Sequence, residues 1–330
     1  MKVTLLKSLF SATVLSLFFT SSIHAKGMQL EVSEPILNKE FPSASGAVFS
    51  NSKVYAIGDD SPYLFELDVD LTIQDKQIIK HYPIAKNGRI VKKVKPDFEA
   101  MDEVDFYGKP AFVILGSGSK AHKREWAFLI TQDQQTKIER SLRPLYQQLY
   151  KQSGFSGKQK LNIEGLASTN KHVFVLNRGN SGTNVIFRLR LDEFVQYLEG
   201  QTDSVNEIVV THAQLPVYQD YEATLSGAEY WPEAEQLVFT ASIEATGDAY
   251  NDGDILGSFV GTVPVNQLGV HGSKLDLTKT TMPAMKNGQR VITKVETVAI
   301  TESSSDKIKG VLLSDNDDGT SELFHFGLTH

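Results

Sequence analysis

The chain has 330 residues, with 33 basic and 40 acidic side chains and a formal net charge of −7 at pH 7. Hydrophobic residues make up 41% and charged residues 22%, a composition that excludes a disordered chain and a polytopic membrane protein. There is no cysteine, which excludes disulfides, thiolate metal sites, iron–sulfur clusters and a cysteine nucleophile.

The first 25 residues are typical of a secretory signal peptide. Lys2 and Lys7 form a positive n-region, and a short apolar stretch runs from Leu9 to Phe19. That stretch is too short for a transmembrane helix, and no later segment is long enough to span a membrane. Cleavage near Ala25 would leave residues 26–330 as a single domain in the periplasm or the medium. Its acidic balance disfavours nucleic acid as a partner, because binding to phosphate backbones relies on basic patches.

A degenerate repeat runs through the remaining chain. Each unit opens with Ser-Gly, or with Glu and a small or apolar residue, and continues with a strand, a polar turn and another strand. The five opening motifs, 54 to 70 residues apart, are Ser45-Gly46-Ala47, Glu99-Ala100-Met101, Glu164-Gly165-Leu166, Ser226-Gly227-Ala228 and Glu296-Thr297-Val298. Short strands and turns repeated at this period are typical of a β-propeller. We therefore predict an all-β fold, a β-propeller of five blades, with six blades as the alternative.

The predicted strands that follow the opening motifs come in pairs. In chain order they are 54–57 and 63–67, 112–115 and 126–130, 173–176 and 185–189, 237–239 and 257–261, and 311–313 and 322–326. Residues 28–32 predict one more strand, which completes the last blade and closes the ring. Apolar residues at helical spacing predict a short helix within 139–152, and 192–198 predicts another helical turn. We expect both helical inserts to lie on loops between blades.

Three glutamates are the candidate catalytic residues. In a propeller the first strand of each blade lines the central channel, and the turns after the second strands gather at one end. The repeat therefore predicts that Glu99, Glu164 and Glu296, which open three first strands, point toward one channel mouth. Glutamate is a poor turn residue and is costly near a channel unless it is paired, which favours a functional role for these three.

Acidic residues in the predicted turns are candidates for a metal site. They are Glu244, Asp248, Asp252, Asp59 and Asp315. Several hard oxygen ligands around one cavity suit Ca²⁺, which accepts irregular geometry. Asp248 and Asp252 fit two positions of a calcium-binding hand loop, but Phe259 occupies the place of the last ligand, so the regular motif is absent. The alternative is that the turn aspartates bond backbone N–H groups.

Basic residues lie in two of the turns. A Gly-Ser-Gly-Ser turn, whose backbone N–H groups can bind an anion, contains Ser117, Ser119 and Lys120 and is followed by Arg124. Arg178 lies in the equivalent turn of the next unit. Cations beside a carboxylate rim can hold a phosphate or carboxylate group of a substrate. The alternative is that Arg178 and Arg124 pair with the glutamates and connect the blades.

The motifs around the three glutamates resemble the D/N-x-E-G/A strand openings of phytase-like and esterase-like bacterial propellers. These motifs are Asp97-Phe98-Glu99-Ala100, Asn162-Ile163-Glu164-Gly165-Leu166 and Lys294-Val295-Glu296-Thr297, the third of which departs from the pattern at its outer positions. The resemblance implies calcium-assisted hydrolysis of phosphoesters or esters, with the three glutamates as channel carboxylates and Arg178 with Lys120 holding the anion. The longer acidic and lysine-bearing signatures of the calcium phytases are absent, so phytate hydrolysis itself is not implied.

Two functions remain open on the sequence. The first is a metal-dependent hydrolase of small anionic or ester substrates, in which Ca²⁺ polarises the substrate and a glutamate takes a proton from the attacking water. The second is a non-catalytic propeller that binds a small ligand or an envelope protein through its turns, because propellers host both kinds of function. The sequence carries no signal for an oligomeric state.

Overall fold

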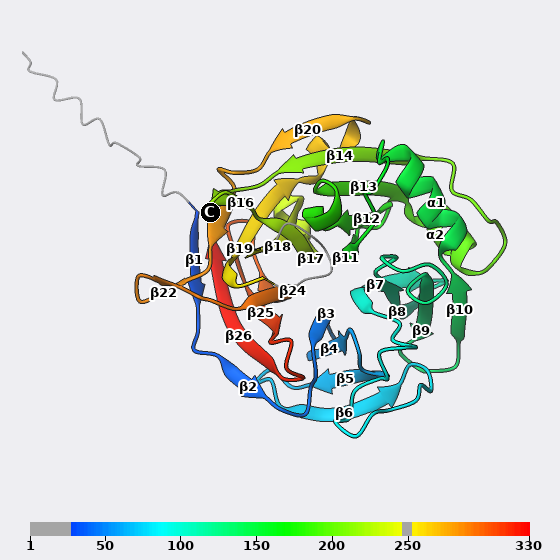
Figure 1. Ribbon diagram of the computed structural model, residues 1–330, viewed down its shortest axis with the longest axis horizontal. Helices are drawn as coiled ribbons and strands as arrows, with labels where there is room; N and C mark the ends of the chain where they lie inside the picture. The colour runs from blue at the N-terminus through cyan, green and yellow to red at the C-terminus, as the bar shows by residue number, and fades with distance from the viewer. Residues whose placement is uncertain (1–27, 246–252) are drawn as a thin grey trace, which may run out of the picture.

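A computed structural model describes residues 28–245 and 253–330. Five sheets, each built on four antiparallel strands, are arranged as blades around a central axis (Figure 1). The innermost strands of neighbouring blades contact each other in ring order. The predicted five-bladed β-propeller is therefore confirmed. The predicted signal peptide, residues 1–25, lies outside the described residues, and none of the helices within them is long and apolar enough to cross a membrane.

The blades follow each other along the chain, and each is described from its inner to its outer strand. The first blade comprises β3 (Ala44–Ser50), β4 (Lys53–Gly58), β5 (Tyr63–Leu67) and β6 (Ile73–Ile78), and the second β7 (Phe98–Phe106), β8 (Lys109–Gly116), β9 (Trp126–Thr131) and β10 (Lys137–Ser141). The third comprises β11 (Ile163–Ser168), β12 (His172–Asn177), β13 (Val185–Arg190) and β14 (Ile208–Gln214), to which β20 (Ser273–Asp276) adds in parallel.

The fourth blade comprises β17 (Thr224–Trp231), β18 (Gln236–Glu244), β19 (Ile255–Pro264) and β21 (Thr281–Pro283), and the fifth β24 (Lys294–Ser303), β25 (Lys307–Asp315), β26 (Ser321–Thr329) and β1 (Gln29–Val32). Strand β2 (Ile36–Asn38) also pairs with β26. Two short hairpins, β15–β16 (Val217–Tyr218, Tyr221–Glu222) and β22–β23 (Met285–Lys286, Gln289–Arg290), lie in the connections that lead into the fourth and fifth blades. Three 3₁₀ turns are η1 (Gly179–Ser181), η2 (Pro232–Ala234) and η3 (Val265–Gly269).

The ring is closed by the first described strand. Strand β1 pairs antiparallel with β26, with Gln29 opposite Thr329 and Val32 opposite Phe326. The fifth blade thus takes its outermost strand from the beginning of the described chain and its other three from the end. The strand predicted at 28–32 is therefore present in the predicted place.

The two helices differ in part from the prediction. Helix α1 (Arg143–Gln152) lies between the second and third blades, as expected, but residues 139–141 belong to β10, where Glu139 pairs with Phe128. Helix α2 (Leu191–Leu198) is present but connects β13 to β14 inside the third blade, so its predicted place between blades was wrong. Both helices bury apolar side chains against the same hydrophobic cluster, which includes Leu145, Tyr146 and Phe194.

Each opening motif of the repeat forms a β-bulge in an inner strand. The register shifts occur at Ala44/Gly46, Phe98/Ala100, Ile163/Gly165, Leu225/Ala228 and Val295/Thr297. A bulge leaves one residue unpaired and re-aims its side chain. In three blades the unpaired residue is a glutamate, namely Glu99, Glu164 or Glu296, and in the first blade it is Ser45. The repeated motif therefore marks the position at which the inner strand turns a side chain out of the sheet.

The small residue of the motif is required by the approach of the next blade. A Cβ atom at Gly165 would lie 2.4 Å from the carbonyl oxygen of Ser226, and one at Gly227 would lie 2.5 Å from the Cα of Thr297. Neither strand backbone can yield easily, because each is hydrogen-bonded to the next strand of its own blade. Glycine at these positions therefore lets neighbouring inner strands lie close together around the axis.

Candidate functional site

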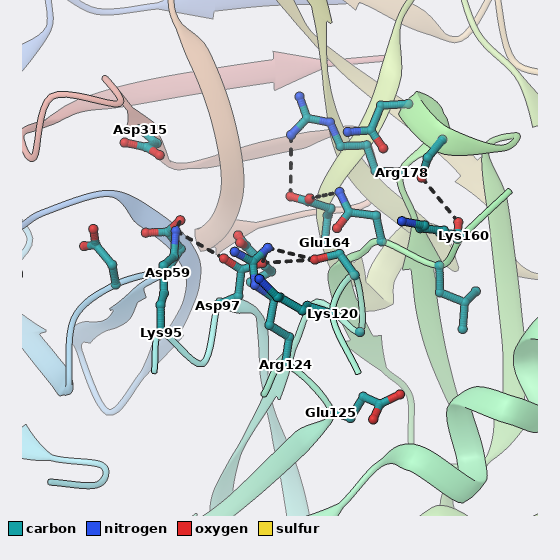
Figure 2. A pocket seen from close by; sticks show the side chains of 18 of the residues that line it. Asp59, Lys95, Asp97, Lys120, Arg124, Glu125, Lys160, Glu164, Arg178 and Asp315 are labelled. Atoms are coloured by element: carbon teal, nitrogen blue, oxygen red, sulfur yellow. Dashed lines mark hydrogen bonds and ion pairs between the residues drawn. The ribbon is translucent and has the colours of Figure 1, made fainter. Parts of the chain in front are cut away.

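A cavity of about 1230 Å³ opens at one end of the channel (Figure 2). The turns after the second strands of all five blades contribute to its lining, together with the starts of three inner strands. Its acidic lining residues are Asp59, Asp60, Asp97, Glu99, Glu125, Glu164, Glu244, Asp315 and Asp317, and its basic ones are Arg89, Lys92, Lys95, Lys120, Arg124, Lys160, Arg178 and Lys294. Nearly equal numbers of acidic and basic side chains therefore meet in one space.

Arg178 is the centre of one charged cluster. Its guanidinium group lies 2.5 Å from Glu244, 3.4 Å from Glu296 and 3.6 Å from Glu164, and its side chain is only 5% exposed. Burial alone would lower the pKa of Arg178, but the three carboxylates raise it well above its ordinary value. Arg178 is therefore a permanent cation, and it connects the third, fourth and fifth blades. The sequence left open whether Arg178 binds a substrate or pairs with the glutamates, and the structure shows that it pairs with them.

Lys294 forms a second cluster in the fifth blade. Its ammonium group lies 3.2 Å from Glu296, 3.7 Å from Asp315 and 3.1 Å from Asp317. Glu296 does not line the cavity itself, but both of its cationic partners do. Lys294, at which the third opening motif departs from the D/N-x-E-G/A pattern, is thus a counter-ion of Glu296.

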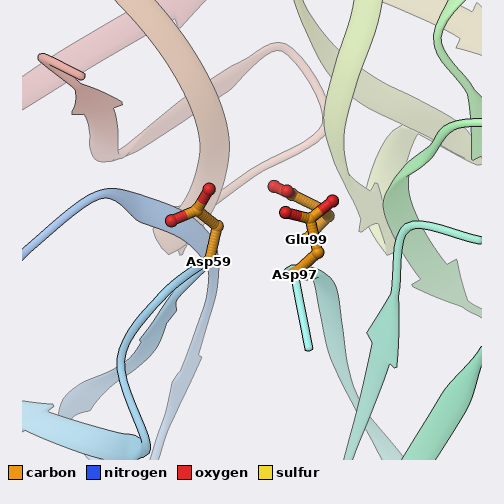
Figure 3. Close-up of side chains that lie close together, drawn as sticks. All are labelled: Asp59, Asp97 and Glu99. Atoms are coloured by element: carbon orange, nitrogen blue, oxygen red, sulfur yellow. The ribbon is translucent and has the colours of Figure 1, made fainter. Parts of the chain in front are cut away.

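Three carboxylates from the first two blades form a third cluster, which we call the acidic trio: Asp59, Asp97 and Glu99 (Figure 3). Each offers an oxygen atom, and these atoms all lie within 4.8 Å of one another. The Lys95 ammonium group contacts Asp59 and lies 3.1 Å from Asp97. Within the described residues no hydrogen bond or ion pair engages Glu99.

The donors of the acidic trio fit a divalent cation. All three are hard carboxylate oxygens, the ligand type of Ca²⁺ and Mg²⁺, and they come from two blades in an irregular arrangement. Asp59 Oδ1 is inaccessible to solvent and has no hydrogen-bond partner, which leaves a buried acceptor unsatisfied. The acidic trio can therefore hold a metal ion.

Burial raises the pKa of several of these carboxyl groups. It raises the pKa of Asp59 to about 6 against the opposing charge of Lys95, and that of Glu164 to about 8 against the opposing charge of Arg178. The pKa of Glu99 is raised well above its ordinary value by burial and by the neighbouring charge of Glu164. The pKa of Asp315 is raised to about 8, mainly by burial. These groups therefore keep their protons to higher pH than ordinary carboxyl groups do.

These shifts predict that the protein loses stability as the pH rises from about 5 to about 8. Each of Asp59, Glu164 and Asp315 has a folded pKa above that of an unfolded carboxyl, so between about pH 4 and 8 the folded state binds more protons than the unfolded state. The stabilisation is complete below the unfolded pKa and is lost as the pH passes through the folded values. Thermal melting across this range measures the effect, and a Tm that rises with pH would contradict it.

The basic turn of the second blade holds Asp97, one member of the acidic trio, in place. Ser117 Oγ donates to Asp97 Oδ2 over 2.6 Å, and Arg124 lies 2.6 Å from the same oxygen and donates to Ser119 Oγ over 2.8 Å. Ser117 is fully buried and does not line the cavity, whereas Ser119, Lys120 and Arg124 do. A Cβ at Gly118 would meet the ring of Tyr146 at 2.6 Å, so helix α1 packs directly against this turn.

The sequence-predicted metal residues do not form one group. Asp59 belongs to the acidic trio, whereas Glu244 pairs with Arg178 and Asp315 with Lys294. Asp248 and Asp252 lie outside the described residues. Sequence reasoning assigned no site role to Asp97, Lys95 and Lys294. Asp97 and Lys294 each lie two residues before a bulge glutamate. A charged residue at that position of the opening motif is the sequence signal that could have identified both.

No curated protein matches the chain in sequence. Among solved structures, a glutaminyl cyclase from Myxococcus xanthus is 11% identical with a TM-score of 0.48, and the match covers 91% of this chain and 96% of that chain. An α-L-arabinofuranosidase from Podospora anserina is 9% identical with a TM-score of 0.47, over 91% and 97% of the two chains. An α-L-arabinanase from Cellvibrio cellulosa is 11% identical with a TM-score of 0.45, over 89% and 91%.

These structural similarities are too low to transfer an activity to this chain. A sequence match to a family model covers residues 40–328 and so includes all of the inner strands and the turns that line the cavity. That family is described as one of unknown function, DUF6929, and this five-bladed propeller belongs to it.

Proposed function

We propose that the protein is a hydrolase of small phosphoester or ester substrates, which bind in the cavity at the channel mouth. The observation that carries this proposal is the convergence of the acidic trio, the protonatable Glu164 and the cations of the second-blade turn on one cavity. The resemblance of the strand openings to phytase-like and esterase-like propellers supports the same reaction class. Export to the periplasm or the medium is part of the proposal.

Ca²⁺ is the metal ion that we propose for the acidic trio. Asp59, Asp97 and Glu99 would hold it, because they present hard oxygens from two blades without the octahedral order that Mg²⁺ demands. When bound, such an ion polarises the substrate and lowers the pKa of an attacking water. Lys120 and Arg124 lie on the same blade as Asp97 and Glu99, and we assign them the binding of the anionic oxygens of the substrate.

Glu164 supplies the proton in this proposal. Because burial raises its pKa to about 8, Glu164 is mostly protonated at pH 7 and suits donation to a leaving group better than removal of a proton from water. Asn162 Nδ2 donates to Glu164 Oε1 over 2.5 Å and so fixes the orientation of the carboxyl. Arg178 is a positioning residue, since it holds Glu164, Glu244 and Glu296 from three blades.

The proposal is tested with a panel of chromogenic phosphate and carboxylic esters, each assayed with EDTA and with added Ca²⁺. We expect turnover of at least one ester in Ca²⁺, loss of most of that turnover in EDTA, and a higher Tm in Ca²⁺ than in EDTA. A chain that hydrolyses no ester and has the same Tm in both solutions would overturn the proposal and favour a binding propeller.

A further inference from the structure

Lys95 places a positive charge directly beside the acidic trio. It lies two residues before Asp97, in the connection between β6 and β7, and its side chain is 16% exposed. Its ammonium group contacts Asp59 and lies 3.1 Å from Asp97 Oδ1. Burial opposes the charge, yet the carboxylates of Asp59 and Asp97 raise the pKa of Lys95. One fixed positive charge is therefore already bound to two of the three trio carboxylates.

The ammonium group does not satisfy the trio completely. Glu99 has no ion-pair partner within the described residues, and Asp59 Oδ1 is buried without a hydrogen bond. The neighbouring Asp60 lines the same cavity, is only 3% exposed, and also has a buried oxygen, Oδ1, with no partner. Buried carboxylate oxygens without donors are costly, so this region retains acceptor capacity for a ligand that brings more positive charge than one lysine.

A divalent ion and the Lys95 ammonium group cannot both occupy the trio. Calcium–oxygen distances are about 2.3–2.6 Å, so an ion held by the oxygens of Asp59 and Asp97 would lie within about 5 Å of an ammonium group in contact with them. Repulsion between a double and a single positive charge at that distance is strong in a partly buried site. Lys95 lines the cavity and has a flexible unbranched side chain, so its ammonium group has open space to move into.

We propose that Lys95 is a built-in counter-ion which a divalent cation displaces from Asp59 and Asp97. The inference rests on the proposed metal site and adds its regulation, because the ion must compete with a covalently attached cation for Asp59 and Asp97. Lys95 thus keeps the two blades together without metal and limits the affinity for it. Removal of the Lys95 charge then strengthens metal binding, because the ion no longer competes with an attached cation for Asp59 and Asp97.

Calorimetric titration with Ca²⁺ alone tests this inference on the wild type and on Lys95→Met, which keeps most of the length of the side chain without its charge. We expect the variant to bind Ca²⁺ at least about tenfold more tightly than the wild type. Lys92→Met is the matched control, because Lys92 lines the same cavity from the same connection and forms no ion pair within the described residues. It should bind Ca²⁺ as the wild type does.

Melting curves show whether the variant is folded. Lys95→Met should melt below the wild type in EDTA, because two carboxylates lose their counter-ion, and should recover the difference in Ca²⁺. Lys95→Arg, which keeps the charge, should bind Ca²⁺ no more tightly than the wild type. Equal or weaker Ca²⁺ binding by Lys95→Met than by the wild type would overturn the inference, as would an absence of binding by both.

The ester panel separates this inference from the proposed function. Tighter Ca²⁺ binding by Lys95→Met together with no ester turnover by the wild type would support the counter-ion role and rule out the proposed hydrolase function. Ester turnover that is insensitive to EDTA, together with no Ca²⁺ binding by either protein, would rule out the counter-ion role. The protein would then be a hydrolase that works without the metal.

Discussion

Glu164→Gln is expected to lower kcat for ester hydrolysis by about 10²- to 10⁴-fold, the usual contribution of a positioned acid or base. The carboxyl of Glu164 lines the cavity, is 5% exposed, and holds a proton at pH 7 because burial raises its pKa to about 8. Glutamine has the same shape but cannot give a proton to a leaving group. Steady-state rates at pH 7 with the best ester of the panel measure the loss.

Stability provides the control for this substitution. Because Glu164 is mostly neutral at pH 7, replacing it with a neutral amide should leave the Tm close to that of the wild type. Glu125→Gln is the matched variant: Glu125 also lines the cavity, but it accepts a hydrogen bond from the backbone N–H of His122 and has no part in the proposed reaction. A Glu164→Gln protein that retains most of the wild-type kcat would rule out proton donation by this residue.

Arg178→Met is expected to destabilise the folded protein by about 3–5 kcal/mol, as does the removal of one partner from a buried ion pair. The guanidinium group contacts Glu164, Glu244 and Glu296, which come from three different blades. Without it, buried carboxylates face each other with Lys294 as the remaining contact cation of Glu296. Denaturant unfolding at pH 7 measures the change in the free energy of unfolding.

The pH dependence distinguishes charge from packing as the cause of this loss. Between pH 7 and pH 9 the carboxyl of Glu164, whose pKa is raised to about 8, loses its proton, so the gap between Arg178→Met and the wild type should widen. Arg190→Met is the control, because Arg190 is half exposed and pairs with the exposed Asp192, and such surface pairs contribute about 0–1 kcal/mol. Equal losses at pH 7 and pH 9 would indicate that Arg178 acts through packing alone.

The first three strands of each blade were predictable from the sequence, and the outermost strands of the first four blades were not. The opening motifs are recognisable because a bulge residue and a small residue must recur wherever inner strands meet, as at Glu164 and Gly165. The outermost strands carry no such constraint. Strands β6 (IQDKQI) and β10 (KIERS) are largely polar edge strands, and only pairing with their neighbours, not an apolar pattern, makes them strands.

The positions of the candidate site residues follow from the repeat, but their partners do not. Equivalent places in five units predict that Glu99, Glu164 and the turn residues converge, because the ring brings equivalent positions together. The pairing of each cation with a carboxylate depends on how far its side chain extends toward a neighbouring blade. Lys95, for example, contacts Asp59 of the preceding blade, and Arg178 reaches Glu296, which is 118 residues away along the chain. No local spacing carries that information.

The closing strand has a consequence for how this fold forms. Because Gln29 pairs with Thr329, the last sheet cannot be completed until the chain from residue 29 to residue 329 is available. Bringing such distant segments together carries a large loop-closure entropy, and folds rich in distant contacts fold slowly. Until then the fifth blade exposes the unpaired edge of β26, a template for pairing with another molecule. The interval before closure is therefore the period in which a nascent chain is most exposed to aggregation, and a chaperone that covers this edge would protect it.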